Sequence, residues 1–240
     1  MTKLLYQTDS YLKEFHAKVV AVEKETHAII LDQTAFYPGG GGQVPDKGLL
    51  RFNGKEARLA RAKHGPDGIL HFIEPEDALP EIDSEVTGLV DWDLRYKTMR
   101  THTAMHILCG VIYRDYGAHV TGGDMEPLKG RMDFEFESLS ADLVGVIDAA
   151  VNKEVAASRP IRVAILPREE AFKIPDLIRT KISLLPEGIK EVRTVEIVGL
   201  DLQADGGTHV NNTSEVGTIH VVDYKSKGKI NKRIYVELEE

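Results

Sequence analysis

Four side chains in two short motifs have the types and spacing of metal ligands. The motifs are HTAMH at residues 102–106 and DGGTH at residues 205–209. On a helix, residues four apart share a face, so His102 and His106 could bind one ion. A tetrahedral zinc needs further ligands, and the second motif offers an imidazole and a carboxylate. Such a histidine pair alone is commonly an ordinary surface or core feature, but the two motifs together predict a metal site.

Cys109 lies on the helical face predicted for the two histidines. A helix rises about 1.5 Å per residue, so residues 102 and 109 are separated by about 10 Å along its axis. One ion with bonds of about 2 Å does not reach both side chains. We therefore interpret Cys109, the single cysteine of the chain, as a small buried apolar residue.

The segment FYPGGGGQ at residues 36–43 is unusual because consecutive glycines carry a high backbone entropy cost. It is either a flexible loop or a loop whose bare N–H groups approach a ligand closely. The segment lacks the Lys-Ser/Thr pair of a P-loop and the spacing of a dinucleotide-binding motif. Both of those nucleotide-binding sites are therefore excluded.

The elements that must position these motifs change in character along the chain. The first part is rich in predicted strands, such as residues 16–22 and 26–32, and Asn53-Gly54 predicts a hairpin turn. This pattern is typical of a small β-barrel or sandwich. Further on, helices are predicted at 93–116 and 140–158 and strands at 161–166, 191–198, 216–222 and 230–238. We expect a β-rich domain over 1–88 and an α+β domain with an antiparallel sheet over 89–240.

The net charge of −8 argues against a general nucleic-acid binder, whose surface is basic. A local basic stretch does occur over residues 221–233. It is either a solvated hairpin tip or an edge that contacts phosphates. No apolar run is long enough to span a membrane, and no signal peptide is recognisable, so we expect a cytoplasmic protein.

Four motifs in this order resemble a known family. They are the glycine-rich segment, HTAMH, RMDF at residues 131–134, and DLQADGGTHV at residues 201–210. The chain closely resembles, over nearly its whole length, the editing domain of alanyl-tRNA synthetase and its free-standing relatives, the AlaX proteins of medium length. The resemblance implies a small β-barrel followed by an α+β domain shared with threonyl-tRNA synthetase editing. It also implies ATP-independent hydrolysis of the ester in tRNA(Ala) mischarged with serine, with glycine as a second candidate, while the alanyl ester is spared.

The family's zinc ligands fall on His102, His106, position 205 and His209, which implies one zinc ion per chain. The family usually has cysteine at position 205, whereas this chain has Asp205. A carboxylate is an acceptable zinc ligand, so Asp205 can complete a tetrahedron. Alternatively it points elsewhere and water takes the fourth place. The ion could activate water, polarise the ester carbonyl or anchor the substrate, and these roles stay open.

The resemblance also suggests residues that contact the substrate. Thr34 matches a position that the family uses to prefer serine over alanine, because a site built for a hydroxyl rejects an analogue lacking it. It could equally be a strand threonine that packs by its methyl group. The other candidates are Gln43 and Gln203 as polar neighbours of the substrate, and Gly40, Gly41, Gly42 and Thr208 as binding residues. Asp201 and Thr208 could instead support the metal ligands or make structural hydrogen bonds.

Two functions of other classes stay open at this point. The chain could be a metal-dependent esterase that acts on another acyl substrate. It could also be a non-catalytic tRNA-binding module with a structural zinc. A closed set of four protein ligands would favour the binding role, and an open coordination position would favour catalysis. The sequence leaves the oligomeric state open.

Overall fold

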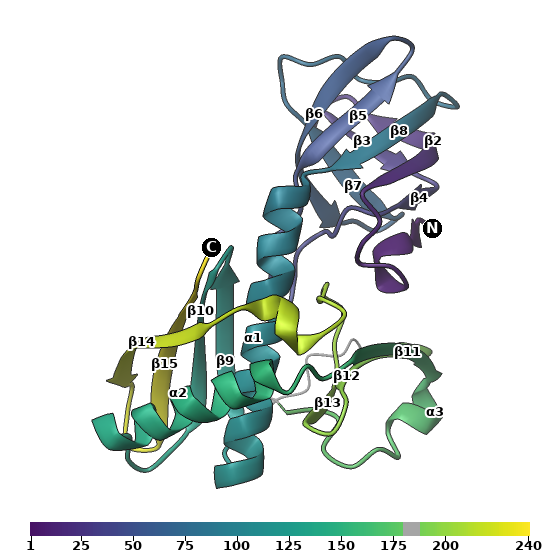
Figure 1. Ribbon diagram of the computed structural model, residues 1–240. Coiled ribbons are helices and arrows are strands. Elements are labelled where there is room, and N and C mark those ends of the chain that lie inside the picture. Colours follow the sequence, from purple (N-terminus) through teal and green to yellow (C-terminus); the bar gives the residue numbers. More distant parts are fainter. Residues whose placement is uncertain (180–187) are drawn as a thin grey trace. The chain divides into compact units, whose positions relative to one another are not determined.

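The computed structural model describes residues 1–179 and 188–240, and these residues form two compact units (Figure 1). The first unit spans Met1–Tyr96 and the second spans Lys97–Glu240. Helix α1, Trp92–Tyr116, begins in the first unit and continues into the second. The domain boundary expected at residues 88 and 89 stays a prediction.

The first unit contains a closed barrel of six antiparallel strands. In barrel order the strands are β2 (Glu14–Glu23), β3 (Ala28–Leu31), β7 (Ile69–Ile73), β6 (Lys55–His64), β5 (Gly48–Phe52) and β8 (Glu85–Val90). Outside the barrel, β1 (Lys3–Leu4) pairs in parallel with β4 (Gln33–Thr34), and the short helix η1 (Leu5–Gln7) follows β1. The predicted β-rich domain is thus a barrel rather than a sandwich.

The barrel closes because alternate side chains point inward around a continuous core. Its core includes Phe15, Phe36, Leu50 and Leu59, all of them buried. The predicted hairpin turn is confirmed, since Asn53-Gly54 joins β5 to β6. Both turn residues have positive φ, 48° and 73°, which Asn and Gly tolerate better than other residues.

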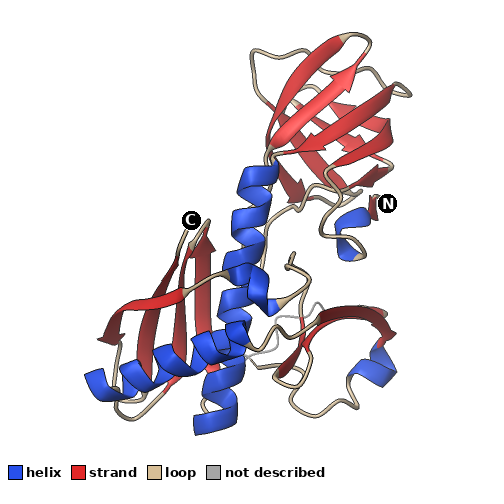
Figure 2. Cartoon of the chain, viewed as in Figure 1, coloured by secondary structure: helices blue, strands red, loops and turns tan. Residues whose placement is uncertain are grey.

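The described residues of the second unit have an α+β fold, as predicted, and form two antiparallel sheets instead of one (Figure 2). One sheet has the order β14 (Ile219–Ser226), β15 (Asn231–Leu238), β10 (Lys129–Glu135), β9 (Val120–Glu126); the other has β11 (Ile161–Pro167), β12 (Glu191–Ile197), β13 (Asp201–Ala204). The helices are α1, α2 (Ala141–Ala156), α3 (Arg168–Ala171) and the 3-10 turn η2 (Thr213–Val216). The strand expected from residue 216 begins only at Ile219, because η2 occupies the preceding residues.

Helix α1 contacts both sheets of the second unit through glycines that permit close approach. A Cβ atom on Gly130 of β10 would lie 2.5 Å from the sulfur of Met105. A Cβ atom on Gly110 of α1 would lie 3.0 Å from the Cβ of Asp201. Residues 101–112 are all buried, so the helix is covered all round and not only along the predicted apolar stripe.

Helix α2 begins where the sequence predicts. The Ser140 side chain accepts a hydrogen bond from the Leu143 N–H at 3.2 Å, which satisfies one of the free donors of the first turn. The helix ends at Ala156, before Pro160. Val144, Ile147 and Val151 form its buried face, at the spacing of three to four residues that an amphipathic helix requires.

The basic stretch forms the tip of the hairpin between β14 and β15. Lys232 turns inward and donates to the carbonyls of Gly228 and Lys229 at 2.8 and 3.0 Å. Arg233 forms two hydrogen bonds with the Asp133 carboxylate on β10. Lys225, Lys227 and Lys229 are exposed. Among the described residues, no helix is long and apolar enough to cross a membrane.

Candidate metal centre

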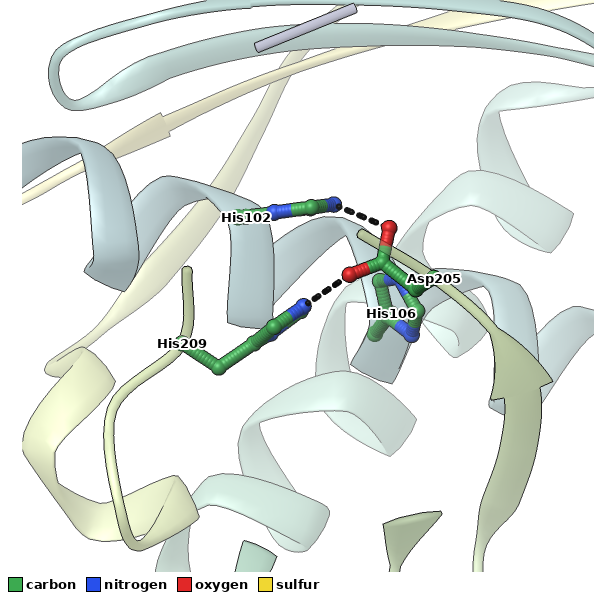
Figure 3. Close-up of side chains that lie close together, drawn as sticks. All are labelled: His102, His106, Asp205 and His209. Atoms are coloured by element: carbon green, nitrogen blue, oxygen red, sulfur yellow. Dashed lines mark hydrogen bonds and ion pairs between the residues drawn. The ribbon is translucent and has the colours of Figure 1, made fainter. Parts of the chain in front are cut away.

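The two predicted motifs meet in one cluster of four side chains (Figure 3). Helix α1 carries His102 and His106, and the loop after β13 carries Asp205 and His209. Each residue offers one ligand atom, and these four atoms lie within 4.8 Å of one another. The rings of His102 and His209 stack with their centroids 4.1 Å apart. Residues a hundred positions apart in the chain therefore form a single group.

Hydrogen bonds shape the loop and attach it to helix α1. The Gly207 N–H donates to Oδ2 of Asp205 at 2.8 Å, which forms a tight turn between the two candidate ligands of this motif. The Val210 N–H donates to the hydroxyl of Thr103 on the helix at 3.3 Å. The same hydroxyl lies 3.2 Å from Nδ1 of His209. Thr103 thus links the loop to the helix at the middle of the HTAMH motif.

Two of the histidines have one ring nitrogen facing a polar side chain outside the cluster. Nδ1 of His106 lies 3.5 Å from Oδ2 of Asp201, which leaves Nε2 for the cluster. Nδ1 of His209 faces Thr103, and its Nε2 lies 3.0 Å from Oδ2 of Asp205. Metal-binding histidines usually have such a partner on the second nitrogen, because it fixes the tautomer and the ring orientation.

The donor set fits zinc. Three imidazoles and one carboxylate are donors that zinc accepts, and four is its usual coordination number in proteins. The four ligand atoms lie within 4.8 Å of one another, on three buried histidines and the partly buried Asp205. Oδ1 of Asp205 is 3.5 Å from Nε2 of His102, and Oδ2 is 3.0 Å from Nε2 of His209. The carboxylate therefore faces the histidines rather than solvent, and a divalent ion would replace the protons that these contacts require.

The protonation states also suit a metal ion. Burial lowers the pKa of His102 well below its usual value, and His209 lowers it further. Burial lowers the pKa of His209 to about 4, although Asp205 opposes this effect. Both rings are therefore neutral at pH 7, which is the form that binds metals. Burial would raise the pKa of Asp205, but its interactions with His102 and His209 outweigh burial and hold it well below the usual value.

Asp201 belongs to a second group of polar residues behind His106. Its Oδ2 accepts a hydrogen bond from the Gln203 amide at 2.6 Å, and its Oδ1 lies 3.3 Å from Nε of Arg179. The Gln203 amide also donates to the sulfur of Cys109 at 3.3 Å. Burial would lower the pKa of His106, but Asp201 outweighs it and raises that pKa. The Gln203 amide nitrogen therefore points toward Asp201, the carboxylate that faces His106.

Cys109 is buried, as the sequence predicts, and lies outside the four-residue cluster. Burial raises the pKa of its thiol far above the usual value, with a further contribution from the charge of Asp201. A thiol held in its protonated form is a poor metal ligand, because the thiolate is the binding species. The chain therefore offers an Asp carboxylate, and not a thiolate, as the fourth donor.

The glycine-rich segment of the first unit has an unusual backbone. Gly39, Gly40, Gly41 and Gly42 all have positive φ, at 82°, 128°, 58° and 88°. The N–H and C=O groups of Gly40 and Gln43 bond to each other at 2.9 and 3.1 Å, which closes a tight loop. A residue with a side chain at position 40 would need a backbone conformation that L-amino acids rarely adopt. The segment is therefore a defined turn with exposed main chain at Gly40 and Gly41.

Thr34 and Gln43 are buried in the first unit, and Thr208 is buried in the second. The Thr34 hydroxyl accepts a hydrogen bond from the Phe36 N–H at 3.1 Å and lies 2.9 Å from Nε2 of His71. Since Thr34 is fully buried, a substrate reaches its hydroxyl only if the surrounding chain opens. The roles of Thr34, Gln43 and Thr208 toward a substrate stay predictions.

Two residues at the cluster were missed by the sequence reasoning. Thr103 lies between the two histidines of HTAMH, and its contact with His209 depends on a loop a hundred residues away. Arg193 of β12 is buried and lies 3.5 Å from Oδ2 of Asp205. A usable signal for Arg193 was its position, because an arginine inside a strand flanked by Val192, Thr194 and Val195 needs a buried partner.

Comparison with known protein families identifies the class. Residues 6–94 match the model described as tRNA synthetases class II (A), and residues 192–235 match the one described as threonyl and alanyl tRNA synthetase second additional domain. The second match includes Asp205 and His209 of the cluster. The fold and the site thus define a protein built from alanyl/threonyl-tRNA synthetase-type domains, as the resemblance implied.

Full-length relatives narrow this class to one family. The alanyl-tRNA editing protein AlaX-M of Saccharolobus solfataricus is 42% identical over 98% of each chain. The protein of the same name from Methanosarcina acetivorans is 36% identical over 99% of each chain. The alanine–tRNA ligase of Ignicoccus hospitalis is 36% identical over 92% of this chain but only 24% of the ligase. The chain belongs to the AlaX-M family of alanyl-tRNA editing proteins.

Proposed function

We propose that this chain is a trans-editing hydrolase that cleaves the aminoacyl ester of seryl-tRNA(Ala) and uses one zinc ion. Glycyl-tRNA(Ala) is a second candidate substrate, and alanyl-tRNA(Ala) is spared. The enzyme acts in the cytoplasm, where tRNA is charged. The observation that carries this proposal is the convergence of His102, His106, Asp205 and His209 from two distant segments. The editing function in the names of its full-length relatives supports it.

The four cluster residues are proposed to hold the ion, and their neighbours to orient them. When bound, zinc can lower the pKa of a water molecule or polarise an ester carbonyl. Nδ1 of His106 lies 3.5 Å from the Asp201 carboxylate, and Nδ1 of His209 lies 3.2 Å from the Thr103 hydroxyl. Both histidines then present Nε2 as the donor. An aminoacyl ester is already activated, so this arrangement needs to provide only modest assistance.

Substrate selection is proposed to involve the first unit. The exposed main chain of Gly40 and Gly41, with Gly42, can approach a ligand without side-chain hindrance. Thr34 would discriminate serine from alanine through its hydroxyl, which is held by His71 and Phe36. A site that bonds a substrate hydroxyl disfavours a substrate without one, because its polar groups are then left unpaired. Gln43, Gln203 and Thr208 complete the proposed substrate contacts.

One observation favours a second function, a non-catalytic tRNA-binding module with a structural zinc. The side chains of His102, His106 and His209 are 5%, 8% and 1% exposed, and Asp205 is 15% exposed. Four protein donors in a closed site are typical of structural zinc. Asp205 is the most accessible of the four, so catalysis would require the site to open on its side.

Deacylation of purified seryl-, glycyl- and alanyl-tRNA(Ala) tests the proposed function. We expect rapid loss of serine and little loss of alanine, and the variant His102→Ala should abolish the difference while circular dichroism shows a folded chain. His16→Ala, which changes an exposed histidine on β2, is the matched control and should retain activity.

The other outcomes distinguish the alternatives. If His102→Ala unfolds the chain and the wild-type protein binds tRNA(Ala) without deacylating it, the metal is structural and the binding module is correct. If small acyl esters are hydrolysed as fast as the tRNA ester, the chain is an esterase on another substrate. Either result contradicts the proposed editing activity.

A further inference from the structure

Arg193 holds the main chain of Asp205 at both of its polar groups. The Asp205 N–H donates to the carbonyl of Arg193 at 3.1 Å. In the other direction, Nη1 of Arg193 donates to the carbonyl of Asp205 at 2.9 Å. The same Nη1 lies 3.5 Å from Oδ2 of the Asp205 carboxylate. A single residue of β12 thus contacts the backbone and the side chain of Asp205.

This guanidinium is buried against the cluster. Its side chain is 4% exposed, and a buried charge is strongly unfavourable unless it is paired and hydrogen-bonded. The Asp205 carboxylate lies within ion-pair distance of this guanidinium. The charge of Arg193 therefore acts on Asp205, the carboxylate of the cluster.

The contacts fix the direction of the carboxylate. With both main-chain groups held by Arg193, and with the Gly207 N–H on Oδ2 at 2.8 Å, little rotation is left to the side chain. Its two oxygens then face Nε2 of His102 and Nε2 of His209, as Figure 3 shows. A carboxylate positioned before an ion arrives loses less conformational entropy when it binds.

We propose that Arg193 is the positioning residue that makes Asp205 a metal ligand in this chain. It holds the carboxylate toward the histidines through the main-chain and side-chain contacts described above. This inference deepens the proposed function and rests on the same metal site. It predicts that Arg193 and Asp205 act on metal affinity as one unit.

A double-mutant cycle on zinc affinity tests this coupling. The full chain is stripped with a chelator, and the zinc dissociation constant is measured by competition for wild type, Arg193→Met, Asp205→Asn and the double variant. Each single change should weaken zinc binding by about 10- to 100-fold, the effect typical of groups that support metal ligands. In the Asp205→Asn background, Arg193→Met should lower the zinc affinity by less than about threefold, because the carboxylate that Arg193 positions is already absent.

A structural role alone would give a different pattern. Equal losses from Arg193→Met in both backgrounds, or a lower melting temperature with unchanged zinc affinity, would overturn the inference. Arg162→Met on the adjacent strand β11, where the side chain is exposed, is the matched control and should leave zinc affinity unchanged.

A conservative variant covers the case in which Arg193→Met fails to fold. Arg193→Lys keeps the charge but not the planar group with several donors, so it should still weaken zinc binding several-fold in the Asp205 background only. Unchanged affinity of this variant would contradict the inference. Because no tRNA is present, the cycle can succeed even if seryl-tRNA(Ala) is not deacylated, which separates this inference from the proposed function.

Discussion

Nε2 of His71 lies 2.9 Å from the hydroxyl of Thr34, and both side chains are completely buried in the barrel unit. The His71 ring also makes an edge contact with Phe36, at a centroid distance of 6.0 Å. A buried imidazole is thus the direct neighbour of the threonine proposed to select serine. The protonation state of His71 matters for the fold and for the hydroxyl it contacts.

His71 should make the barrel less stable in acid. Burial lowers the pKa of its imidazole to about 4, although backbone groups of Ile29 and Ile69 oppose the effect. The unfolded chain, with a usual histidine pKa of about 6.5, binds the proton first as the pH falls. The contribution of His71 to the free energy of unfolding is therefore fully present above pH 6.5 and is lost progressively toward pH 4. About 2 kcal/mol of it is lost at pH 5.

Two measurements check this expectation. The His71 ring resonances should titrate near pH 4 in the folded protein, and His71→Gln should reduce the loss of unfolding free energy between pH 7 and pH 5. His16→Gln, an exposed change on β2, should leave that loss as it is in wild type. A His71 titration near pH 6.5 would contradict the account.

The buried pair of Arg95 and Asp46 should be essential for the barrel unit. Arg95 is completely buried, forms a salt bridge with Asp46, and donates to the carbonyl of Ala35 at 2.6 Å. Arg95→Met leaves the buried Asp46 carboxylate without its charge partner and should cost about 3–5 kcal/mol of unfolding free energy. Arg51→Met removes an exposed pair with Glu56 and should cost less than about 1 kcal/mol. Equal denaturation midpoints for the two variants would show that the buried pair is dispensable.

Gly41 and Gly54 form a matched pair that tests the glycine-rich segment. Both have positive φ, 58° and 73°, and an added Cβ would meet no atom within 4 Å at either position. Alanine should therefore cost about 1–2 kcal/mol of strain at each site. Only Gly41→Ala should lower kcat/KM on seryl-tRNA(Ala), by about tenfold, because it alone alters a proposed substrate contact. Equal kcat/KM values would remove the segment from the substrate site.

The lysines at the β14–β15 tip should contribute to tRNA binding. Lys227 and Lys229 are exposed, whereas Lys232 is used inside the turn. Lys227→Glu combined with Lys229→Glu should weaken tRNA(Ala) binding. It should also reduce the slope of the logarithm of the binding constant against the logarithm of salt concentration, by the equivalent of about one to two phosphate contacts. Lys153→Glu with Lys173→Glu introduces the same charge change at other exposed positions and serves as control. Binding curves that shift equally for both double variants would indicate only a general effect of net charge.

Local patterns in the sequence predict the helices and strands that carry the cluster. They predict less well how these elements contact one another. Apolar spacing predicts the helix with His102 and His106, and Ser140 predicts the start of the next helix. The β9–β10 hairpin was missed because the glycines and charged residues of residues 120–135 have a weak strand pattern. These residues form strands because they pair with β15 and pack against helix α1, and such long-range contacts leave little trace in local sequence.

The same distinction applies at the candidate site. Residue types and spacing suffice to bring together His102, His106, Asp205 and His209 as a hypothesis, because each motif is local. The contacts of Arg193 with Asp205 and of Thr103 with His209 arise from the pairing of strands and from loop folding. They follow from tertiary structure and are absent from any short motif.

Zinc titration of the chelator-stripped chain shows whether editing depends on a single metal centre. Seryl-tRNA(Ala) deacylation is measured at increasing ratios of zinc to protein. We expect negligible activity without metal, a linear rise, and a break at one equivalent, because His102, His106, Asp205 and His209 form one site. Full activity of the stripped protein, or a rate that shows no break near one equivalent, would contradict a single catalytic metal centre.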